Sequence, residues 1–355
     1  MYQSRVAIII DEYSLTPAVW TAYMKHIASI RELHEVVLFV DENSNRVIEA
    51  DFVNKIDIEK YSSIISLYLK LIKYKIKIIY VPHILLAAKL SVVPVFGVKV
   101  FLWLQGLLPE ESFMRHRCNI RYRAISFIEK YSLNRLAGVV LVSNAMLCHI
   151  KEKYNYTPDK FAILPCRSDL VFDCSVTKNK NSFVYVGGAS EWQKIDTVIL
   201  SFIEIRKNNL FATLDFISRD IREIEIMLNG VVSENDRENI NVFSLESRSE
   251  MASKLSEYKF GFLFRDDIPV NRVSSPIKYL EYLSCGIIPI MSNCIGDYSK
   301  YTEENNIGVS LKNGSELDAF KMIESLTISS CDILEKYNSI KSDMDSNNPF
   351  LNFFR

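Results

Sequence analysis

The sequence predicts an α/β protein made of two doubly wound, Rossmann-like domains that face each other across a cleft. Three observations predict this fold. Short β-branched runs alternate with longer segments whose apolar residues recur at helical spacing. The same alternation restarts near Ser182. The 355 residues, of which 48% are hydrophobic, are enough for two domains with separate cores.

The first half of the chain alternates between predicted strands and helices. Its strands are expected at 6–10, 36–39, 78–81, 98–103, 139–142 and 161–164. Its helices are expected at 20–30, 62–71, 110–135 and 143–154. Because parallel strands joined by helices form doubly wound sheets, this half is predicted to be one domain.

The second half repeats the pattern after a polar linker at 166–180. Strands are expected at 183–186, 213–217, 241–243, 260–263 and 287–291, with helices at 192–207 and 276–285 among the connections. We therefore expect an N-terminal domain at 1–168 and a C-terminal domain at 169–335. A C-terminal tail at 336–355 follows, and whether it packs back on the N-terminal domain is left open.

Composition excludes several classes of protein. The seven cysteines form no Cys-x-x-Cys pair, which argues against a zinc ribbon and favours reduced thiols in a cytoplasmic protein. The apolar start of the chain is too short for a secretory leader, and no run of about 18 apolar residues is free of charge. The five histidines lack metal-ligand spacing, and Asp343-x-Asp345 falls in a polar stretch, so no metal or other cofactor is expected.

Charge is distributed unevenly along the chain. Residues 1–165 hold 21 basic and 15 acidic residues, whereas residues 166–355 hold 21 and 28. Residues 60–135 alone hold 13 basic and 3 acidic residues. With Tyr68, Leu71, Tyr74, Phe113 and Tyr122 expected on the surface among them, this segment predicts peripheral binding to an anionic membrane. The alternative is a solvated basic face or part of a phosphate-binding cleft.

The segment 264–286 is the most informative part of the sequence. A predicted strand ends at Arg265, Ser275 is suited to the N-cap of a helix, and Pro276 to its first turn. Free N–H groups at a helix start bind phosphate, and Lys278 adds a full positive charge there. Glu281, three residues on, could accept hydrogen bonds from a ribose diol. The alternative is that Lys278 and Glu281 form a simple surface ion pair.

The run Asn271-Arg-Val-Ser-Ser-Pro276-x-Lys278-x-x-Glu281-Tyr282-Leu-x-Cys-Gly286 resembles the donor-binding signature of a known family. It is similar to GT-B-fold retaining glycosyltransferases of the "glycosyl transferases group 1" family, in the branch common in bacterial surface-polysaccharide clusters. The resemblance implies that Glu281 binds the ribose of a nucleotide sugar. It also implies that the loop before the helix faces the diphosphate and the donor sugar. The residues assigned to this site are Asn271, Ser274, Ser275, Pro276, Glu281 and Tyr282.

One position departs from that family. Many relatives have a donor-sugar-binding glutamate eight positions before the ribose glutamate, where this sequence has Val273. The departure leaves the identity of the donor sugar open.

A second segment, 183–196, runs from a strand through Gly187 and Gly188 towards a helix. Glycines allow close approach of a ligand, but no G-x-G-x-x-G is present, which argues against a dinucleotide oxidoreductase. By resemblance, Lys194 contacts the donor phosphate. Gly188 stands where relatives often have arginine, so Arg265 is expected to supply the missing charge, unless it pairs with Asp266 or Asp267. Ser244, at another strand end, is expected beside the base.

Residues on the acceptor side are expected in the N-terminal half. Glu12 follows the first strand, and Gln105, Gly106 and Glu110 follow the strand 98–103. By resemblance they face the cleft. Glu110 could instead simply begin a helix, where the macrodipole favours acidic residues.

The resemblance implies transfer of a sugar from a nucleotide-diphosphate sugar to a lipid-linked glycan, with retention and without metal. The expected pathway is capsule, O-antigen or other lipopolysaccharide, or exopolysaccharide synthesis at the inner face of the cytoplasmic membrane. Lys194, Arg265 and Lys278 are the candidate catalytic residues, because fixed cations stabilise a departing diphosphate. No nucleic-acid partner is expected. The alternative is a non-catalytic protein of the same fold that binds a nucleotide sugar or a polysaccharide.

Overall fold

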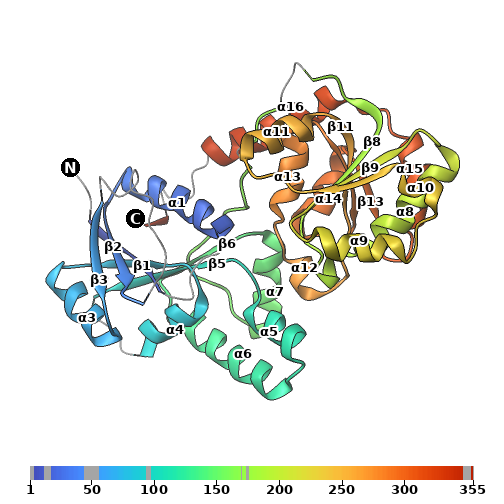
Figure 1. Cartoon of the computed structure of the whole chain (residues 1–355). Coiled ribbons are helices and arrows are strands. Elements are labelled where there is room, and N and C mark those ends of the chain that lie inside the picture. Colours follow the sequence, from blue (N-terminus) through green and yellow to red (C-terminus); the bar gives the residue numbers. More distant parts are fainter. Residues whose placement is uncertain are drawn as a thin grey trace. The chain divides into compact units, whose positions relative to one another are not determined.

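The computed structural model describes residues 4–11, 17–43, 56–92, 97–168, 170–172, 176–346 and 353–354. The chain divides into two compact units (Figure 1). The N-terminal unit comprises residues 1–165 together with 347–355, and the C-terminal unit comprises residues 166–346. Each unit is described by itself below.

The N-terminal unit is built on a parallel sheet with the strand order β3-β2-β1-β4-β5-β6-β7. The strands are β1 (Arg5–Ile10), β2 (Glu35–Asp41), β3 (Asp57–Tyr61), β4 (Ile78–Val81), β5 (Lys99–Leu104), β6 (Gly138–Leu141) and β7 (Phe161–Ile163). The helices are α1 (Pro17–Arg31), α3 (Ile64–Lys73), α4 (Ile84–Val92), α5 (Leu108–His116), α6 (Asn119–Leu133) and α7 (Asn144–Tyr154). Figure 1 shows α1 on one side of the sheet and α3, α4 and α6 on the other.

The C-terminal unit holds a second parallel sheet, with the order β10-β9-β8-β11-β12-β13. Its strands are β8 (Asn179–Val186), β9 (Thr213–Ile217), β10 (Ile240–Phe243), β11 (Tyr258–Leu263), β12 (Ile288–Ser292) and β13 (Val309–Leu311). Its helices are α8 (Ile195–Asn208), α9 (Ile221–Asn229), α10 (Glu234–Arg237), α11 (Arg248–Ser256), α12 (Pro269–Arg272), α13 (Ile277–Ser284), α14 (Gly296–Asn305), α15 (Ala319–Glu324) and α16 (Ser330–Ser346), with 3-10 turns η1 (Glu191–Gln193) and η2 (Glu316–Asp318). The predicted fold class of two doubly wound α/β sheets is thus confirmed.

Three elements differ from the sequence prediction. The single helix expected at 110–135 is two helices, because Arg117 adopts a left-handed conformation with φ 51° that ends α5. The edge strand β3 was not expected, since its sequence Asp-Ile-Glu-Lys-Tyr has little apolar signal. The polar stretch around Asp343 is helical, because α16 continues to Ser346.

The outer face of the N-terminal unit also differs from expectation. Leu71 is fully buried, and Tyr68, Tyr74, Phe113 and Tyr122 are half-buried rather than exposed. The most exposed apolar side chains of α3 are instead its Ile65, Leu69 and Ile72. Leu67 and Leu71 face the sheet, so the remaining helical positions at i, i+4 and i+7 face solvent.

The end of the chain packs into the N-terminal core. The ring of Phe353 lies 5.0 Å from that of Phe101, and the ring of Phe354 lies 5.6 Å from that of Tyr80. A side chain at Gly138 would come within 2.9 Å of the Phe353 ring, so glycine provides the space for it. The last residues therefore complete the core of this unit.

Candidate functional site

The candidate site lies at the carboxyl ends of β8, β11 and β12 in the C-terminal unit. Ligands of open parallel sheets bind at this edge, close to the point where the strand order reverses. Here β8 and β11 are neighbours at the centre of the order β10-β9-β8-β11-β12-β13. The loops after these two strands hold Gly187 and Arg265, and α13 begins between β11 and β12.

The start of α13 differs from the predicted cap. The N-cap position belongs to Pro276, and it has no side-chain cap hydrogen bond. The hydroxyl of Ser275 instead lies 2.9 Å from that of Tyr298 and accepts a hydrogen bond from the backbone N–H of Cys166. Ser275 was wrongly expected to cap the helix, because Pro276 holds the N-cap position and the Ser275 hydroxyl bonds to these two partners.

Arg265 is the most unusual residue of the site. Its side chain is buried, with 8% of the residue exposed, and its Nη1 has no hydrogen-bond partner in the part of the chain that the structure describes. The expected alternative of an ion pair with a neighbouring acid is wrong, since Asp267 pairs with Arg272. Burial lowers the pKa of Arg265. An unpaired, buried guanidinium is costly, which marks the position as one that an anion would stabilise.

Lys278, in the first turn of α13, lies close to Arg265. Its Nζ donates to Gln193 Oε1 at 2.5 Å and lies 4.8 Å from the centre of the Tyr185 ring. Burial lowers the pKa of Lys278, and the neighbouring charge of Arg265 lowers it further. The two cations repel each other, and within the described residues neither forms an ion pair with an acid, which again favours an anionic ligand.

Gly187 makes room for Lys278. It has φ 134°, and an added Cβ would come within 1.8 Å of Lys278 Nζ. Gly188 similarly faces Asp220, whose Oδ2 would lie 2.8 Å from an added Cβ. The two glycines thus let the loop after β8 approach Lys278 of α13 and Asp220, which precedes α9.

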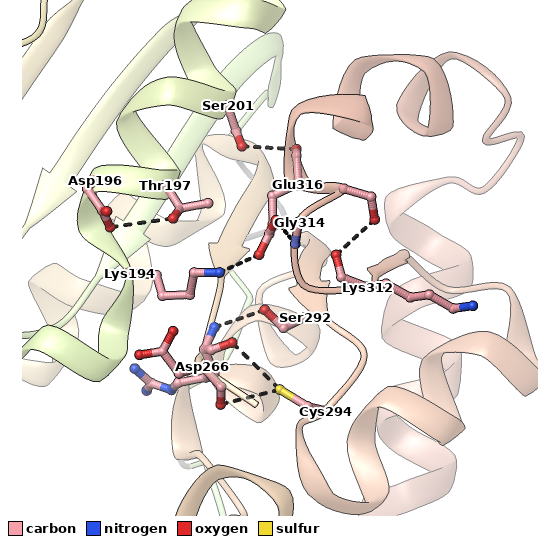
Figure 2. Close-up of polar contacts among 12 residues, drawn as sticks. Lys194, Asp196, Thr197, Ser201, Asp266, Ser292, Cys294, Lys312, Gly314 and Glu316 are labelled. Carbon is pink, nitrogen blue, oxygen red and sulfur yellow. Dashed lines mark hydrogen bonds and ion pairs between the residues drawn. The ribbon is translucent and has the colours of Figure 1, made fainter. Parts of the chain in front are cut away.

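Lys194 follows η1 and begins α8, with φ 50°. Its Nζ donates to Glu316 Oε1 at 2.5 Å, and Figure 2 shows this pair beside the loop of Asp266 and Cys294. Glu316 is buried and also accepts from the backbone N–H of Gly314. Burial alone would raise the pKa of Glu316, but the hydrogen bonds from Lys194 and Gly314 hold it below its ordinary value.

Glu281 is buried on α13 and pairs with Arg248 rather than with Lys278. Arg248 Nη1 lies 2.9 Å from Glu281 Oε1, and its own side chain is 58% exposed. The expected alternative of a surface pair between Lys278 and Glu281 is therefore wrong. Ser244 is exposed just after β10, at the same carboxyl edge of the sheet. Arg248, which the sequence reasoning missed, is the first residue of α11 beyond that loop.

Three predicted residues are tied to the scaffold. Tyr282 is fully buried, and its hydroxyl donates to the Phe262 carbonyl and accepts from the Val186 N–H, joining β11 to β8. Asn271 is buried and donates to the carbonyl of Asp266, and Ser274 donates to the carbonyl of Asn271. These contacts hold the loop between β11 and α13 in place.

The predicted acceptor-side residues lie in the N-terminal unit. Gln105 donates to the Pro82 carbonyl at 2.7 Å, after β5. The Glu110 carboxylate lies 2.7 Å from Lys153 Nζ, between α5 and α7. Glu111 is the acid over Gly106, since an added Cβ there would come within 2.2 Å of Glu111 Oε1. Glu12 lies outside the described residues.

At the same edge, Asp11, which with Glu12 follows the first strand, has a histidine partner that the sequence did not single out. His83 Nε2 is 3.0 Å from Asp11 Oδ1, at the ends of β4 and β1. The Leu86 N–H donates to His83 Nδ1, which assigns the proton of a neutral imidazole to Nε2, facing Asp11. Histidine and aspartate that are 72 positions apart in sequence give no spacing signal.

Taken together, the C-terminal unit has Arg265 and Lys278 beside a helix start, the Lys194–Glu316 pair, and Glu281 along the helix with Arg248 as its partner. This arrangement suits a diphosphate followed by a diol-bearing group. Within the described residues, no group of three or more His, Cys, Asp and Glu side chains is placed to hold a metal ion. None of the helices in that part of the chain is both long and apolar enough to cross a bilayer.

Comparison with family models and with curated proteins found no match. Solved structures do match over nearly the whole chain. The lipopolysaccharide outer core galactosyltransferase WaaB has a TM-score of 0.70 at 12% identity, with 94% of each chain covered. Sucrose-phosphate synthase from Thermosynechococcus elongatus has a TM-score of 0.69 at 13% identity, with 95% of this chain and 94% of that chain covered.

A third match is WaaG, a glycosyltransferase involved in lipopolysaccharide biosynthesis. It has a TM-score of 0.64 at 11% identity and covers 97% of this chain and 96% of its own. At such identities the likeness concerns the fold. Two parallel Rossmann-like sheets and these neighbours show that the chain has the GT-B fold.

Proposed function

We propose that this protein is a retaining glycosyltransferase that uses a nucleotide-diphosphate sugar as its donor. The main supporting observation is the buried Arg265 guanidinium, without a partner for Nη1, beside Lys278 at the start of α13. A diphosphate would satisfy both cations. Glu281, one turn along the helix, would then accept hydrogen bonds from the ribose. Fold neighbours named as glycosyltransferases agree with this class of reaction.

The proposed chemistry needs fixed positive charge rather than an acid–base pair. As the anomeric bond breaks, charge grows on the leaving phosphate, and cations already held in place lower the barrier. Arg265 and Lys278 would meet that charge first. Lys194 would join them by exchanging Glu316 for a phosphate oxygen. The departing phosphate oxygen can accept the proton of the acceptor hydroxyl. The acceptor oxygen then bonds to the anomeric carbon on the face that the phosphate leaves, so the configuration is retained.

The proposed acceptor is a lipid-linked glycan in the synthesis of a bacterial surface polysaccharide. This proposal rests on the resemblance of residues 271–286 to that branch. It implies work at the inner face of the cytoplasmic membrane, as a peripheral protein. Gln105, Gly106 and Glu111 mark the edge of the N-terminal sheet at which the acceptor would bind.

The outer helical face of the N-terminal unit is the proposed membrane contact. Ile65, Leu69 and Ile72 are exposed on α3, and Ile120 and Phe127 are exposed on α6. Every exposed acid or base on α3, α4, α5 and α6 is basic, because Glu110 and Glu129 are buried and Glu111 is half-buried. Each such cation near an anionic leaflet contributes about 1 kcal/mol, and the apolar side chains add to it.

Vesicle co-sedimentation tests the membrane contact. Wild type should bind vesicles rich in anionic lipid at low salt and release them as salt rises. Leu69→Ser with Phe127→Ser should weaken that binding, whereas Phe211→Ser, at an equally exposed position in the C-terminal unit, should not. Equal binding to neutral vesicles would contradict the electrostatic part of the proposal.

A panel of nucleotide sugars, assayed for hydrolysis and for transfer, tests the reaction itself. The second candidate is a non-catalytic protein that binds a nucleotide sugar or polysaccharide. It is favoured by Val273, which is buried where relatives have a sugar-binding acid, and by Gly188, which stands where relatives have arginine. Tight donor binding without hydrolysis or transfer to any acceptor would favour that candidate.

A further inference from the structure

A pocket of about 210 Å³ opens in the N-terminal unit, away from the edge of the sheet that holds Gln105 and Gly106. Its walls come from α3, α4, the amino-terminal halves of β4 and β5, and the turn after α6. The lining residues are Tyr68, Ile79, Leu90, Ser91, Val98, Val100 and Arg135. An apolar cavity of about 150 Å³ can hold a benzene molecule, so this one has room for a short alkyl segment.

The interior of the pocket is apolar. Ile79 and Leu90 are buried at its base, and Ile79 pairs in register with Val100 on the neighbouring strand. The polar groups of the wall are already bonded to backbone. Ser91 donates to the Ala87 carbonyl at 2.7 Å, and the Tyr68 hydroxyl donates to the Leu90 carbonyl at 3.4 Å. Among the described lining residues, the hydroxyls of Ser91 and Tyr68 are thus already bonded, and the aliphatic side chains offer a ligand apolar contact.

The rim of the pocket is positively charged. Arg135 lines the pocket and is exposed; its guanidinium lies 3.6 Å from the centre of the Tyr131 ring and donates to the Tyr131 carbonyl at 3.2 Å. Lys77 is exposed just before β4, at the same edge of the sheet, whereas the side chain of Lys99, between the lining residues Val98 and Val100, faces the opposite side of the sheet. No acid within the described ranges forms an ion pair with Arg135, Lys77 or Lys99.

We propose that this pocket binds the alkyl chain of an anionic amphiphile, with the head group at Arg135. An apolar interior and a cationic rim together match a molecule with a short apolar segment and a phosphate or carboxylate at its end. The site lies at the amino-terminal edge of the sheet. It is thus separate from the edge of this sheet at which the acceptor would bind. The test of this proposal therefore does not depend on transferase activity.

The test uses octyl phosphate below its critical micelle concentration, titrated into the full chain by calorimetry. Wild type should bind it saturably with one site per chain. Octanol lacks the phosphate and inorganic phosphate lacks the alkyl chain, so each should bind at least about tenfold more weakly than octyl phosphate. Tenfold weaker binding corresponds to a loss of about 1.4 kcal/mol of binding free energy. These two controls distinguish an amphiphile site from a site for free phosphate and from a pocket that binds any apolar molecule.

Two variants locate the site on the chain. Arg135→Gln should weaken octyl phosphate binding about tenfold or more, and Val98→Trp, at the half-exposed rim, should abolish it by filling the entrance. Arg123→Gln is the matched control, because it removes an exposed arginine of α6 that does not line the pocket. Unchanged thermal unfolding of each variant would confirm that it folds.

The proposal would be overturned by either of two results. One is octyl phosphate binding to wild type no tighter than octanol or inorganic phosphate. The other is Arg135→Gln and Arg123→Gln weakening octyl phosphate binding equally, because general attraction to a basic face would then account for it.

Discussion

Burial of the Arg265 guanidinium without a partner for Nη1 lowers the stability of the ligand-free protein, because a desolvated charge is left uncompensated. Functional sites commonly retain such costs, since the group is compensated only when the ligand is bound. The neighbouring Lys278 increases the cost through repulsion. Both side chains are thus poised for an anion before one arrives.

Replacing Arg265 with methionine should therefore stabilise the ligand-free protein. Methionine keeps much of the side-chain volume and removes the unpaired charge, so we expect a gain of about 1–3 kcal/mol in the free energy of unfolding. Denaturant unfolding of the two proteins measures it. Arg272→Met, which removes an exposed arginine, should change stability little. A large loss of stability in Arg265→Met would show that the guanidinium is a structural group.

Lys194→Ala and Arg265→Ala should each lower turnover more than they weaken donor binding. The reason is that charge on the leaving phosphate grows in the transition state, so contacts to it strengthen there. Steady-state kinetics with the donor found by the panel, combined with calorimetric donor affinities, gives both quantities. A raised KM with unchanged kcat would assign that residue to ground-state binding alone.

Glu316 should make stability depend on pH through its pair with Lys194. Its folded-state pKa is depressed, so its contribution is present above the ordinary carboxyl pKa and is lost as pH falls through the lower folded value. Compared with Glu316→Gln, wild type should keep a constant stability advantage above about pH 5 and lose it progressively in more acidic solution. Unfolding curves at several pH values measure this; an advantage that persists unchanged at pH 3 would contradict the assignment.

At the scale of elements, the sequence predicted those segments whose signal is local. The strands β8, β9 and β11 and the helix α8 follow from apolar periodicity, and α13 follows from its proline start and the glycine after it. The break between α5 and α6 depends on Arg117 in a left-handed conformation, which no residue type there indicates. The edge strand β3 is stabilised by pairing with β2 rather than by its own composition.

The partners of the charged side chains were beyond prediction for a different reason. Lys194 pairs with Glu316 and Lys278 with Gln193, and both pairs join elements far apart in the chain. The sequence supplied local alternatives, such as Lys278 with Glu281, that the folded sheet does not use. Which side chains meet is determined only by the three-dimensional arrangement of the segments that follow β8, β11 and β13.

The C-terminal phenylalanines form another element that sequence periodicity could not place. Phe353→Ala should destabilise the N-terminal unit by about 3–5 kcal/mol, the usual effect of removing a buried aromatic ring from a packed core. Phe211→Ala, which truncates a ring that is 80% exposed, is the matched control and should change little. Thermal unfolding followed by circular dichroism measures both. Equal effects would show that the chain end is not part of the core.

At the scale of the whole molecule, the two units differ in net charge and in their proposed roles. The N-terminal unit has the basic helical face and the amphiphile pocket, and the C-terminal unit has the cation-lined helix start. The net charge of residues 1–165 is positive and that of residues 166–355 is negative. An anionic surface would therefore attract the first unit and repel the second.

The central claim is that the C-terminal site binds a nucleoside-diphosphate sugar through Arg265 and Glu281. Calorimetric titration of wild type, Arg265→Gln and Glu281→Ala with a panel of nucleotide sugars tests it most directly. The account predicts that at least one donor binds wild type and that each variant loses about 1.5–3 kcal/mol of binding free energy, the scale of a hydrogen bond to a charged group. Failure of every nucleotide sugar to bind wild type, or variants that bind the donor as tightly as wild type does, would contradict the claim.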